Sequence, residues 1–162
     1  MARYQPASDF LIAVINEEAP LSGSIFGDAN LRHLIAMTRD PDRSNRDWAT
    51  FLVAQHDADD DVIRHALLRA ASDDDEVVRA EAIIGLARRD RHLALPLIKQ
   101  AFAAEYVSYP IFEAAAYVAD PALVEDLRRF AAPSDDSTLD SMIAEALAAC
   151  ESGKPPEWCE KD

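Results

Sequence analysis

The sequence is poor in glycine, cysteine, aromatic residues and long apolar runs, and these scarcities exclude several classes of protein. The 162 residues include four glycines and two cysteines, and 7% of them are aromatic. Cys150 and Cys159 are too few for a disulfide framework, which favours a reducing compartment. The longest early apolar run, Phe10 to Ile15, is too short for a membrane span or the apolar core of a secretory leader. We therefore expect a soluble, cytoplasmic protein.

Positive charge is also scarce. Sixteen Lys and Arg stand against thirty Asp and Glu, which gives a formal net charge of −14. This balance repels phosphate backbones and acidic lipid, so we predict neither a nucleic acid nor a membrane as partner. Apolar residues make up 49% of the chain, enough for the core of one ordinary domain.

The apolar pattern predicts helices throughout. Apolar residues recur three and four apart in short blocks, and no alternating strand pattern or hairpin turn interrupts them. The blocks predict a helix from a cap at Ser8 to about Glu17, a loop over residues 19–29, and further helices over about 30–39, 44–56, 60–71, 76–88, 94–105, 109–119, 122–131 and 137–150. Pro96 fits this scheme if it lies in the first turn of its helix. We expect one domain over 1–150 and a disordered acidic tail over 151–162.

The helical blocks repeat along the chain. Residues 45–54 align with residues 78–87 at an offset of 33, and the acidic turn 40–42 aligns with 73–75 at the same offset. Residues 113–119 continue the series at an offset of 32. The intervening helices align on Leu31, Ile63, Ile98 and Leu127. These matches predict about three and a half repeating helical pairs, each of which buries its apolar face against the next pair.

Residues 73–90 carry a recognisable repeat motif. They read Asp-Asp-Asp-Glu-Val-Val-Arg-Ala-Glu-Ala-Ile-Ile-Gly-Leu-Ala-Arg-Arg-Asp. This stretch resembles a HEAT-like repeat of the short bacterial kind named after bilin lyases, and the resemblance is clearest over 30–132. It implies an all-α, right-handed α-solenoid of about three to four antiparallel helix pairs, and an Arg ladder in which Arg46 and Arg79 bond turn carboxylates between repeats. The first copy departs from the pattern with Asn45 and Trp48, and the copy at 109–119 lacks the Arg.

The acidic runs and the histidines give no pattern typical of a metal site. An EF-hand starting at Asp57 would need Gly and Glu at positions where Val62 and Leu68 stand, so we predict helix caps there and at 73–76. The four histidines are not spaced as zinc ligands. We therefore expect no metal and no other cofactor.

We also predict that the protein is not an enzyme. Cys150 lies on the apolar stripe of its helix, which is typical of a small core residue rather than a nucleophile. The sequence has no glycine-rich phosphate loop and no nucleophile elbow.

One polar pattern points to a binding surface. The residue after each aligned core position in the second helix of a pair is basic, and the next position adds further polar groups. The predicted basic row consists of Arg32, Arg64, His65, Lys99, Arg128 and Arg129. The HEAT resemblance implies that these helices line a concave wall, where the row would bind a carboxylate-bearing peptide or another anion. The alternative is a solvated face whose charges pair with Asp61, Glu125 or Asp126.

A second group of candidate residues is aromatic. Tyr106, Tyr109, Phe112 and Tyr117 either anchor an interface or pack the third helical pair.

The predicted function is a non-catalytic scaffold or adaptor that binds another protein or peptide on the concave face. A second hypothesis is an immunity- or inhibitor-type protein that neutralises a basic toxin, in which the acidic turns make the contact. A third is a bilin-lyase-like enzyme subunit. A DNA-glycosylase-like role is disfavoured by the net charge of −14.

Overall fold

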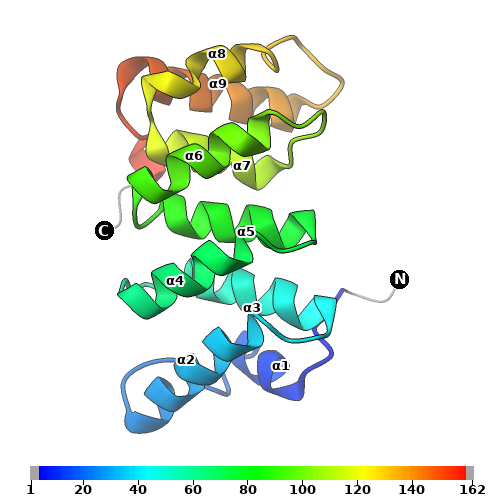
Figure 1. Ribbon diagram of the computed structural model, residues 1–162, viewed down its shortest axis with the longest axis vertical. Helices are drawn as coiled ribbons and strands as arrows, with labels where there is room; N and C mark the ends of the chain where they lie inside the picture. Colours follow the sequence, from blue (N-terminus) through cyan, green and yellow to red (C-terminus); the bar gives the residue numbers. More distant parts are fainter. Residues whose placement is uncertain (1–3, 160–162) are drawn as a thin grey trace. The chain divides into compact units, whose positions relative to one another are not determined.

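The computed structural model describes residues 4–159, and these residues form helices and loops without a strand (Figure 1). The helices are α1 (Asp9–Ile15), α2 (Ile25–Met37), α3 (Arg43–Gln55), α4 (Asp61–Ala70), α5 (Glu76–Ala87), α6 (Arg91–Phe102), α7 (Tyr109–Val118), α8 (Val124–Arg128) and α9 (Ser137–Ser152). Two single turns of 3₁₀-helix, η1 (Pro121–Leu123) and η2 (Glu157–Cys159), complete the described part. The chain divides into two compact units, Met1–Ala82 and Ile83–Asp162, with the boundary inside α5.

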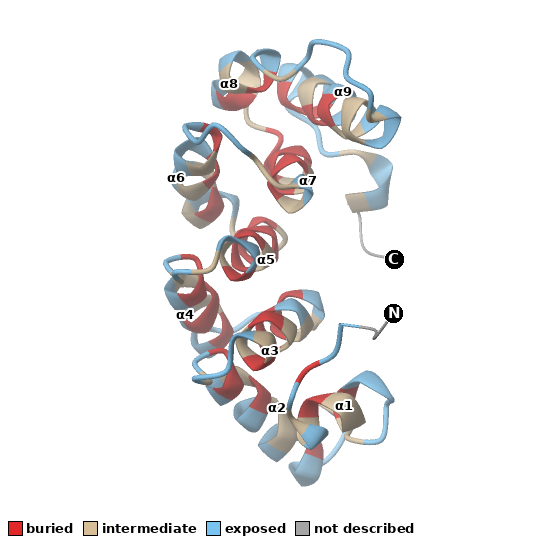
Figure 2. Cartoon of the chain, turned by 90° about the vertical axis from the view of Figure 1, so that its right-hand side faces the viewer, coloured by how far each residue is buried: buried red, intermediate tan, exposed pale blue. Residues whose placement is uncertain are grey.

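The first unit packs its helices in two layers. Figure 2 shows α2 and α4 on one side of this unit and α1 and α3 on the other, with the buried faces between them. Leu11, Leu34, Val53, Ile63 and Leu67 are all completely buried in these helices. Each helix is amphipathic, so its apolar stripe becomes buried only when a neighbouring helix covers it.

The second unit is built in the same way around an aromatic core. Here α6 and α8 form one layer and α7 and α9 the other (Figure 2). The rings of Phe102, Phe112 and Phe130 lie 5.5 to 5.8 Å apart, between α6, α7 and the end of α8. Helix α7 is buried on most sides. Cys150 of α9 packs against it, and its thiol donates a hydrogen bond to the Ala115 carbonyl oxygen at 3.5 Å.

Aspartates before the helices cap them, as the acidic turns predict. Asp60 accepts the Ile63 amide at 2.9 Å, and Asp42, Asp90 and Asp136 accept two amides each. Asp75 accepts the amides of the second and third residues of α5. Each carboxylate satisfies amides that have no partner within the helix and lies at the positive end of the helix dipole.

Two arginines confirm the 33-residue repeat. Arg46 donates to the carbonyl oxygens of Asp40 and Pro41 at 3.2 and 3.3 Å, and Arg79 donates to those of Asp73 and Asp74 at 2.8 and 2.9 Å. These two sets of contacts are equivalent at an offset of 33. Arg46 also reaches the next turn.

In that turn, Arg46 contacts the side chains of Asp73 at 3.0 Å and Asp74 at 3.1 Å. The implied contact between turns is therefore present for Arg46, whereas the contacts of Arg79 are with backbone oxygens of its own turn and not, among the described residues, with a turn carboxylate. Arg43 adds a parallel contact from α3 to Asp75. The predicted all-α fold of stacked helical pairs is confirmed within each unit.

The starts of two helices differ from the prediction. Helix α2 begins at Ile25 instead of residue 30, because the Ser24 side chain accepts the Gly27 amide and starts the helix earlier. Helix α6 begins at Arg91, because Asp90 caps it, so Pro96 lies at its sixth residue rather than in the first turn. Pro96 and His92, whose carbonyl would otherwise have paired with residue 96, are both exposed, so water can satisfy that carbonyl.

The C-terminal segment also differs from the predicted tail. Residues 151–152 belong to α9, Gly153 takes a left-handed conformation after it, and 157–159 form η2. Residues 160–162 lie outside the described residues. The single domain over 1–150 stays a prediction, and the chain groups into the two compact units described above. None of the helices described is long and apolar enough to cross a membrane.

The Arg46 contacts make a stability prediction. Burial raises the pKa of Asp73, but hydrogen bonds from Arg46 and the Asp75 amide outweigh it and hold that pKa below its usual value. Arg46→Ala should lower the free energy of unfolding at pH 7 by about 2 kcal/mol, since a charge-assisted, partly buried network is lost. The difference from the parent should shrink as the pH falls through the lowered pKa of Asp73, where the carboxylate becomes protonated.

Urea unfolding followed by circular dichroism at pH 7 and pH 3 measures both effects. Arg43→Ala is the matched control, because the ion pair of Arg43 with Asp75 is more exposed than that of Arg46 and should contribute less to stability. Equal losses in the two variants, or a loss that is the same at both pH values, would contradict the prediction.

Candidate functional site

In the first unit, two of the three predicted members of the basic row, Arg64 and His65, contact acceptors of the same chain. Arg64 of α4 makes two hydrogen bonds to Asp59, Nε to Oδ1 at 2.7 Å and Nη2 to Oδ2 at 2.9 Å. The Nδ1 atom of His65 lies 2.6 Å from the Asp61 carbonyl oxygen. Arg32 lies exposed on α2. The bidentate pairing fixes the Arg64 guanidinium against its own turn.

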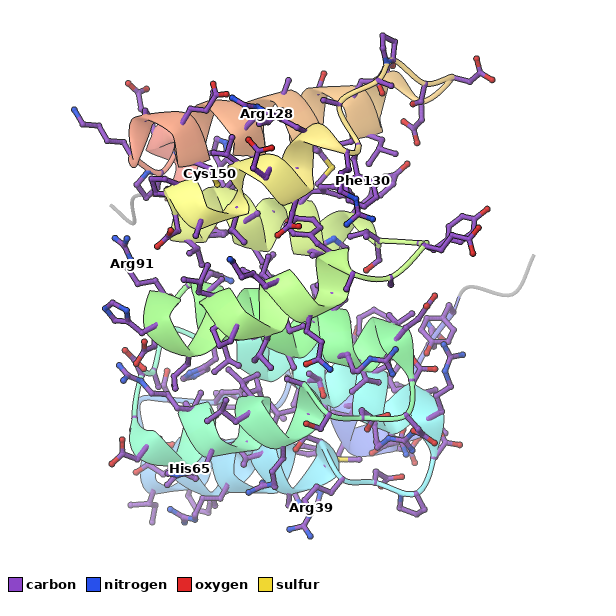
Figure 3. The ribbon with its side chains drawn as sticks, turned by 45° about the horizontal axis from the view of Figure 1, so that its top comes forward. Arg39, His65, Arg91, Arg128, Phe130 and Cys150 are labelled. Atoms are coloured by element: carbon purple, nitrogen blue, oxygen red, sulfur yellow. The ribbon has the colours of Figure 1, made fainter. Side chains whose placement is uncertain are left out.

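In the second unit, Arg128 is paired with carboxylates, Arg129 bonds a backbone oxygen, and Lys99 is exposed. Arg128 donates to Glu125 at 2.7 Å and to Glu151 at 3.1 Å. Arg129 donates to the Phe102 carbonyl oxygen at 3.3 Å, and its guanidinium carbon lies 5.6 Å from the centre of the Phe130 ring. Lys99 is exposed on α6. Figure 3 labels His65 on α4 of the first unit and Arg128 and Phe130 in the second.

These pairings bear on the two interpretations of the row. Of the three carboxylates expected to pair with the row, only Glu125 is seen in an ion pair with it among residues 4–159. The other carboxylates paired with the row are Asp59 and Glu151, which were not predicted as partners from the sequence. Any acidic ligand would have to displace these internal carboxylates or share the cations with them.

A different surface feature lies between α3 and α5 of the first unit. It is a hollow of about 320 Å³, which we call the aromatic groove, and all of its lining residues belong to residues 4–81. They are Tyr4, Asp47, Trp48, Phe51, Val77 and Glu81. This volume lies at the small end of the range of ligand pockets, about 300–1,000 Å³, and suits one side chain of a partner.

Three rings form the apolar part of the groove. The Trp48 ring is stacked on Tyr4, with ring centres 6.2 Å apart and 23° between the planes, and meets Phe51 edge to face at 5.9 Å. Tyr4 is 52% exposed, Phe51 36% and Val77 37%. Such open aromatic surface is typical of residues that anchor interfaces.

Two carboxylates flank the rings. Asp47 is buried and accepts a hydrogen bond from the Tyr4 hydroxyl at 2.7 Å, whereas Glu81 lines the groove from α5. Burial and the adjacent Asp47 carboxylate raise the pKa of Tyr4 to about 12, so the phenol remains a neutral donor. The indole nitrogen of Trp48 is buried and finds no acceptor in the part of the chain that is described.

The N-terminal segment holds Tyr4 over α3. The Ser8 amide donates to the Asn45 side-chain oxygen at 2.9 Å, and the Ala7 amide donates to the Ser44 hydroxyl at 3.3 Å. One signal of this groove is visible in the sequence, namely Trp48 at a position where the next repeat has Glu81. No such signal is visible for Tyr4 or Phe51.

The second unit has a smaller hollow of about 230 Å³ between α7 and α9. Its lining includes Phe112, Glu113, Met142, Glu145 and Trp158. The Trp158 ring packs edge to face on Tyr117 at 5.2 Å, and its nitrogen donates to Glu145 at 2.8 Å. Here the chain's own C-terminal segment contributes the ring.

The other residues singled out in the sequence are structural or exposed. His33 packs edge to face on Phe10 at 4.4 Å, and the Nδ1 atom of His56 accepts the Ala58 amide at 3.0 Å. No group of three or more potential metal ligands was found among residues 4–159.

The four aromatic candidates separate into two kinds. Phe112 is buried and Tyr117 packs against Trp158, whereas Tyr106 is 87% exposed. Tyr109 donates its hydroxyl hydrogen to Asp136.

Comparison with known proteins gives two relatives and a solved structure. No protein-family model matches the chain. The chain is homologous to protein YibA of Escherichia coli K12 and O157:H7, with 30% identity over 133 residues that make up 82% of this chain and 44% of each relative. The X-ray structure of E. coli YibA superposes with a TM-score of 0.65 and 25% identity, over 86% of this chain and 54% of that one. The chain thus spans less than half the length of the curated relatives it matches.

The two thiols make a prediction about reactivity. Burial raises the pKa of Cys150 to about 11 and that of Cys159 to about 12. At pH 8, less than about 1% of each cysteine is therefore in the reactive thiolate form. Neither thiol should react with a disulfide reagent in the folded protein at a rate near that of a free cysteine. Both should react fully in urea.

Absorbance of the released aromatic thiol measures the rate, and Cys159→Ser isolates Cys150. Fast labelling of Cys150 in the folded Cys159→Ser protein would contradict its assignment as a core residue.

Proposed function

We propose that the chain is a cytoplasmic, non-catalytic protein-binding module of the HEAT-like repeat type, and that its partner is a basic protein. The observation that carries this proposal is the pairing of two arginines of the basic row with carboxylates of the same chain. Arg64 is held by Asp59, and Arg128 by Glu125 and Glu151. With thirty acidic residues against sixteen basic ones, the surface left to a partner is dominated by carboxylates. Such a surface attracts a basic protein and speeds its association.

The HEAT-like part of the proposal is supported by the repeated arginine contacts. Arg46 and Arg79 bond equivalent backbone oxygens 33 residues apart. Repeat proteins of this construction present long surfaces to partners, and their stability comes from contacts between neighbouring repeats.

The geometry favours a binding module over the bilin-lyase-like alternative. An open-chain tetrapyrrole needs a long apolar cleft. Three hollows lined by described residues measure about 230, 290 and 320 Å³, near the lower end of the usual range for ligand pockets. A larger hollow of about 760 Å³ in the first unit has the polar groups of Glu17, His56 and Asp57 in its lining, so it is not a purely apolar cleft. An inhibitor- or immunity-type protein needs no such cleft, and binding to a basic partner is what that hypothesis requires.

The test is affinity capture on the immobilised full chain from an extract of the source organism, followed by binding kinetics with each captured protein. We expect a partner of basic isoelectric point whose association rate falls at least tenfold between 50 and 500 mM salt. The variant with Arg64→Glu and Arg128→Glu should bind this partner within twofold of the parent.

The same variant distinguishes the basic row from the acidic surface. Loss of binding in the double reversal, or a partner that is itself acidic, would assign the contact to the basic row and overturn the proposal. Circular dichroism confirms that the variant remains folded.

A further inference from the structure

We infer that the aromatic groove of the first unit is a pocket for one arginine side chain of the partner. This inference rests on the proposed function for the existence of a basic partner. It adds the chemical group that is recognised and the residues that recognise it, namely the rings of Tyr4, Trp48 and Phe51 and the carboxylates of Asp47 and Glu81.

The rings supply the surface on which a guanidinium stacks. Trp is the strongest of the aromatic side chains in binding a cation over its face, and a planar guanidinium also stacks on the ring. Trp48 stands between Tyr4 and Phe51, so a group placed in the groove contacts aromatic carbon on more than one side. A volume of about 320 Å³ holds one such side chain.

The carboxylates supply the opposite charge. Asp47 accepts one hydrogen bond from Tyr4, and a carboxylate has about four acceptor sites, so it retains capacity for a guanidinium N–H. Glu81 lines the groove from α5. Residues 1–82 contain sixteen Asp and Glu, eight Arg and no Lys, so the field around the groove attracts cations.

The second unit already combines a guanidinium, a ring and a carboxylate. The guanidinium carbon of Arg88 lies 6.0 Å from the centre of the Tyr117 ring, and the same arginine lowers the pKa of Glu113, which burial raises more strongly. The chain therefore builds this type of contact with its own residues. No arginine is among the described residues that line the aromatic groove. The nearby Arg43, which interacts electrostatically with Tyr4 and Asp47, is bonded to Asp75.

The exposure of these rings is not explained by the repeat. Phe51 aligns with Ile84, which is 4% exposed, whereas Phe51 is 36% exposed. Trp48 replaces the glutamate that the next copy has at Glu81. A large apolar residue that stays open to solvent costs free energy which burial against a partner would recover.

Arginine fits this lining better than lysine. Its planar group stacks on Trp and donates to a carboxylate in the same plane, while an ammonium is more strongly hydrated and loses more on leaving water. Citrulline has nearly the same shape as arginine without the charge, so it tests the electrostatic part separately.

The experiment uses the full chain with Trp158→Phe, which leaves Trp48 as the remaining tryptophan and keeps a ring beside Tyr117. The probes are three blocked pentapeptides, Gly-Gly-Xaa-Gly-Gly, with arginine, lysine or citrulline at the centre. Titration is followed by Trp48 fluorescence and by amide chemical shifts. The arginine peptide should bind at least about fivefold more tightly than the lysine peptide, and the citrulline peptide should not saturate.

Matched variants locate the binding. Phe51→Ala and Asp47→Asn should each weaken the arginine peptide at least about fivefold. Tyr106→Ala removes an exposed ring outside the groove, and Asp28→Asn removes an exposed charge from α2, so both should bind as the parent does. Circular dichroism and thermal unfolding verify the fold of each variant, and Phe51→Ala, at a partly exposed site, keeps the test valid if Asp47→Asn unfolds.

The results separate this inference from the proposed function. Equal binding of the citrulline peptide, or unchanged binding in folded Phe51→Ala, overturns the arginine pocket. A basic partner from the affinity capture that binds Phe51→Ala normally also overturns the pocket but leaves the proposed function standing. Specific arginine binding in the groove together with an acidic captured partner overturns the proposed function alone.

Discussion

The contact between Arg46 and the turn of the following repeat positions α3 relative to the start of α5 in the first unit. Arg46 leaves α3, holds the carbonyl oxygens of its own turn and bonds Asp73 and Asp74 in the turn that begins α5. Arg43 makes a parallel contact to Asp75, which in turn caps α5. These bonds therefore set the spacing between α3 and the start of α5. That spacing contributes to the width of the aromatic groove, because five of its six lining residues belong to those two helices.

The local features of this chain were predictable because they depend on neighbours in sequence. Helix periodicity, the aspartate caps and the 33-residue repeat all follow from residues within a turn or two of one another. The candidate site was not predictable in the same way. Tyr4 reaches Asp47 across 43 positions, and Arg128 reaches Glu151 across 23. Pattern analysis assigns such residues to a helix or a segment, but it does not say which side chain will neutralise which charge.

The pairing of charges decides which surface a partner meets. An arginine whose guanidinium is bonded to a carboxylate of its own turn, as Arg64 is to Asp59, offers little to an acidic ligand, because binding must first break or share that pair. Counting arginines along a helix therefore overestimates a cationic surface when acidic turns adjoin it. In this chain the turns that cap the helices are the same turns that neutralise the arginines, so the two roles of aspartate are coupled.

The two units differ in how the hollows between their helices are filled, and this difference suggests which residues determine the specificity of partner binding. In the second unit, Trp158 from the C-terminal segment packs on Tyr117 and bonds Glu145, so the hollow between α7 and α9 is lined in part by the chain itself. In the first unit, the N-terminal segment places Tyr4 at the edge of the groove but leaves Phe51 and Val77 open. The repeat pattern supplies the rigid walls in both cases. The residues that depart from it, Trp48 above all, supply the chemistry, so a homologue that retained the repeat but restored glutamate at this position would keep the fold and lose the aromatic floor of the groove.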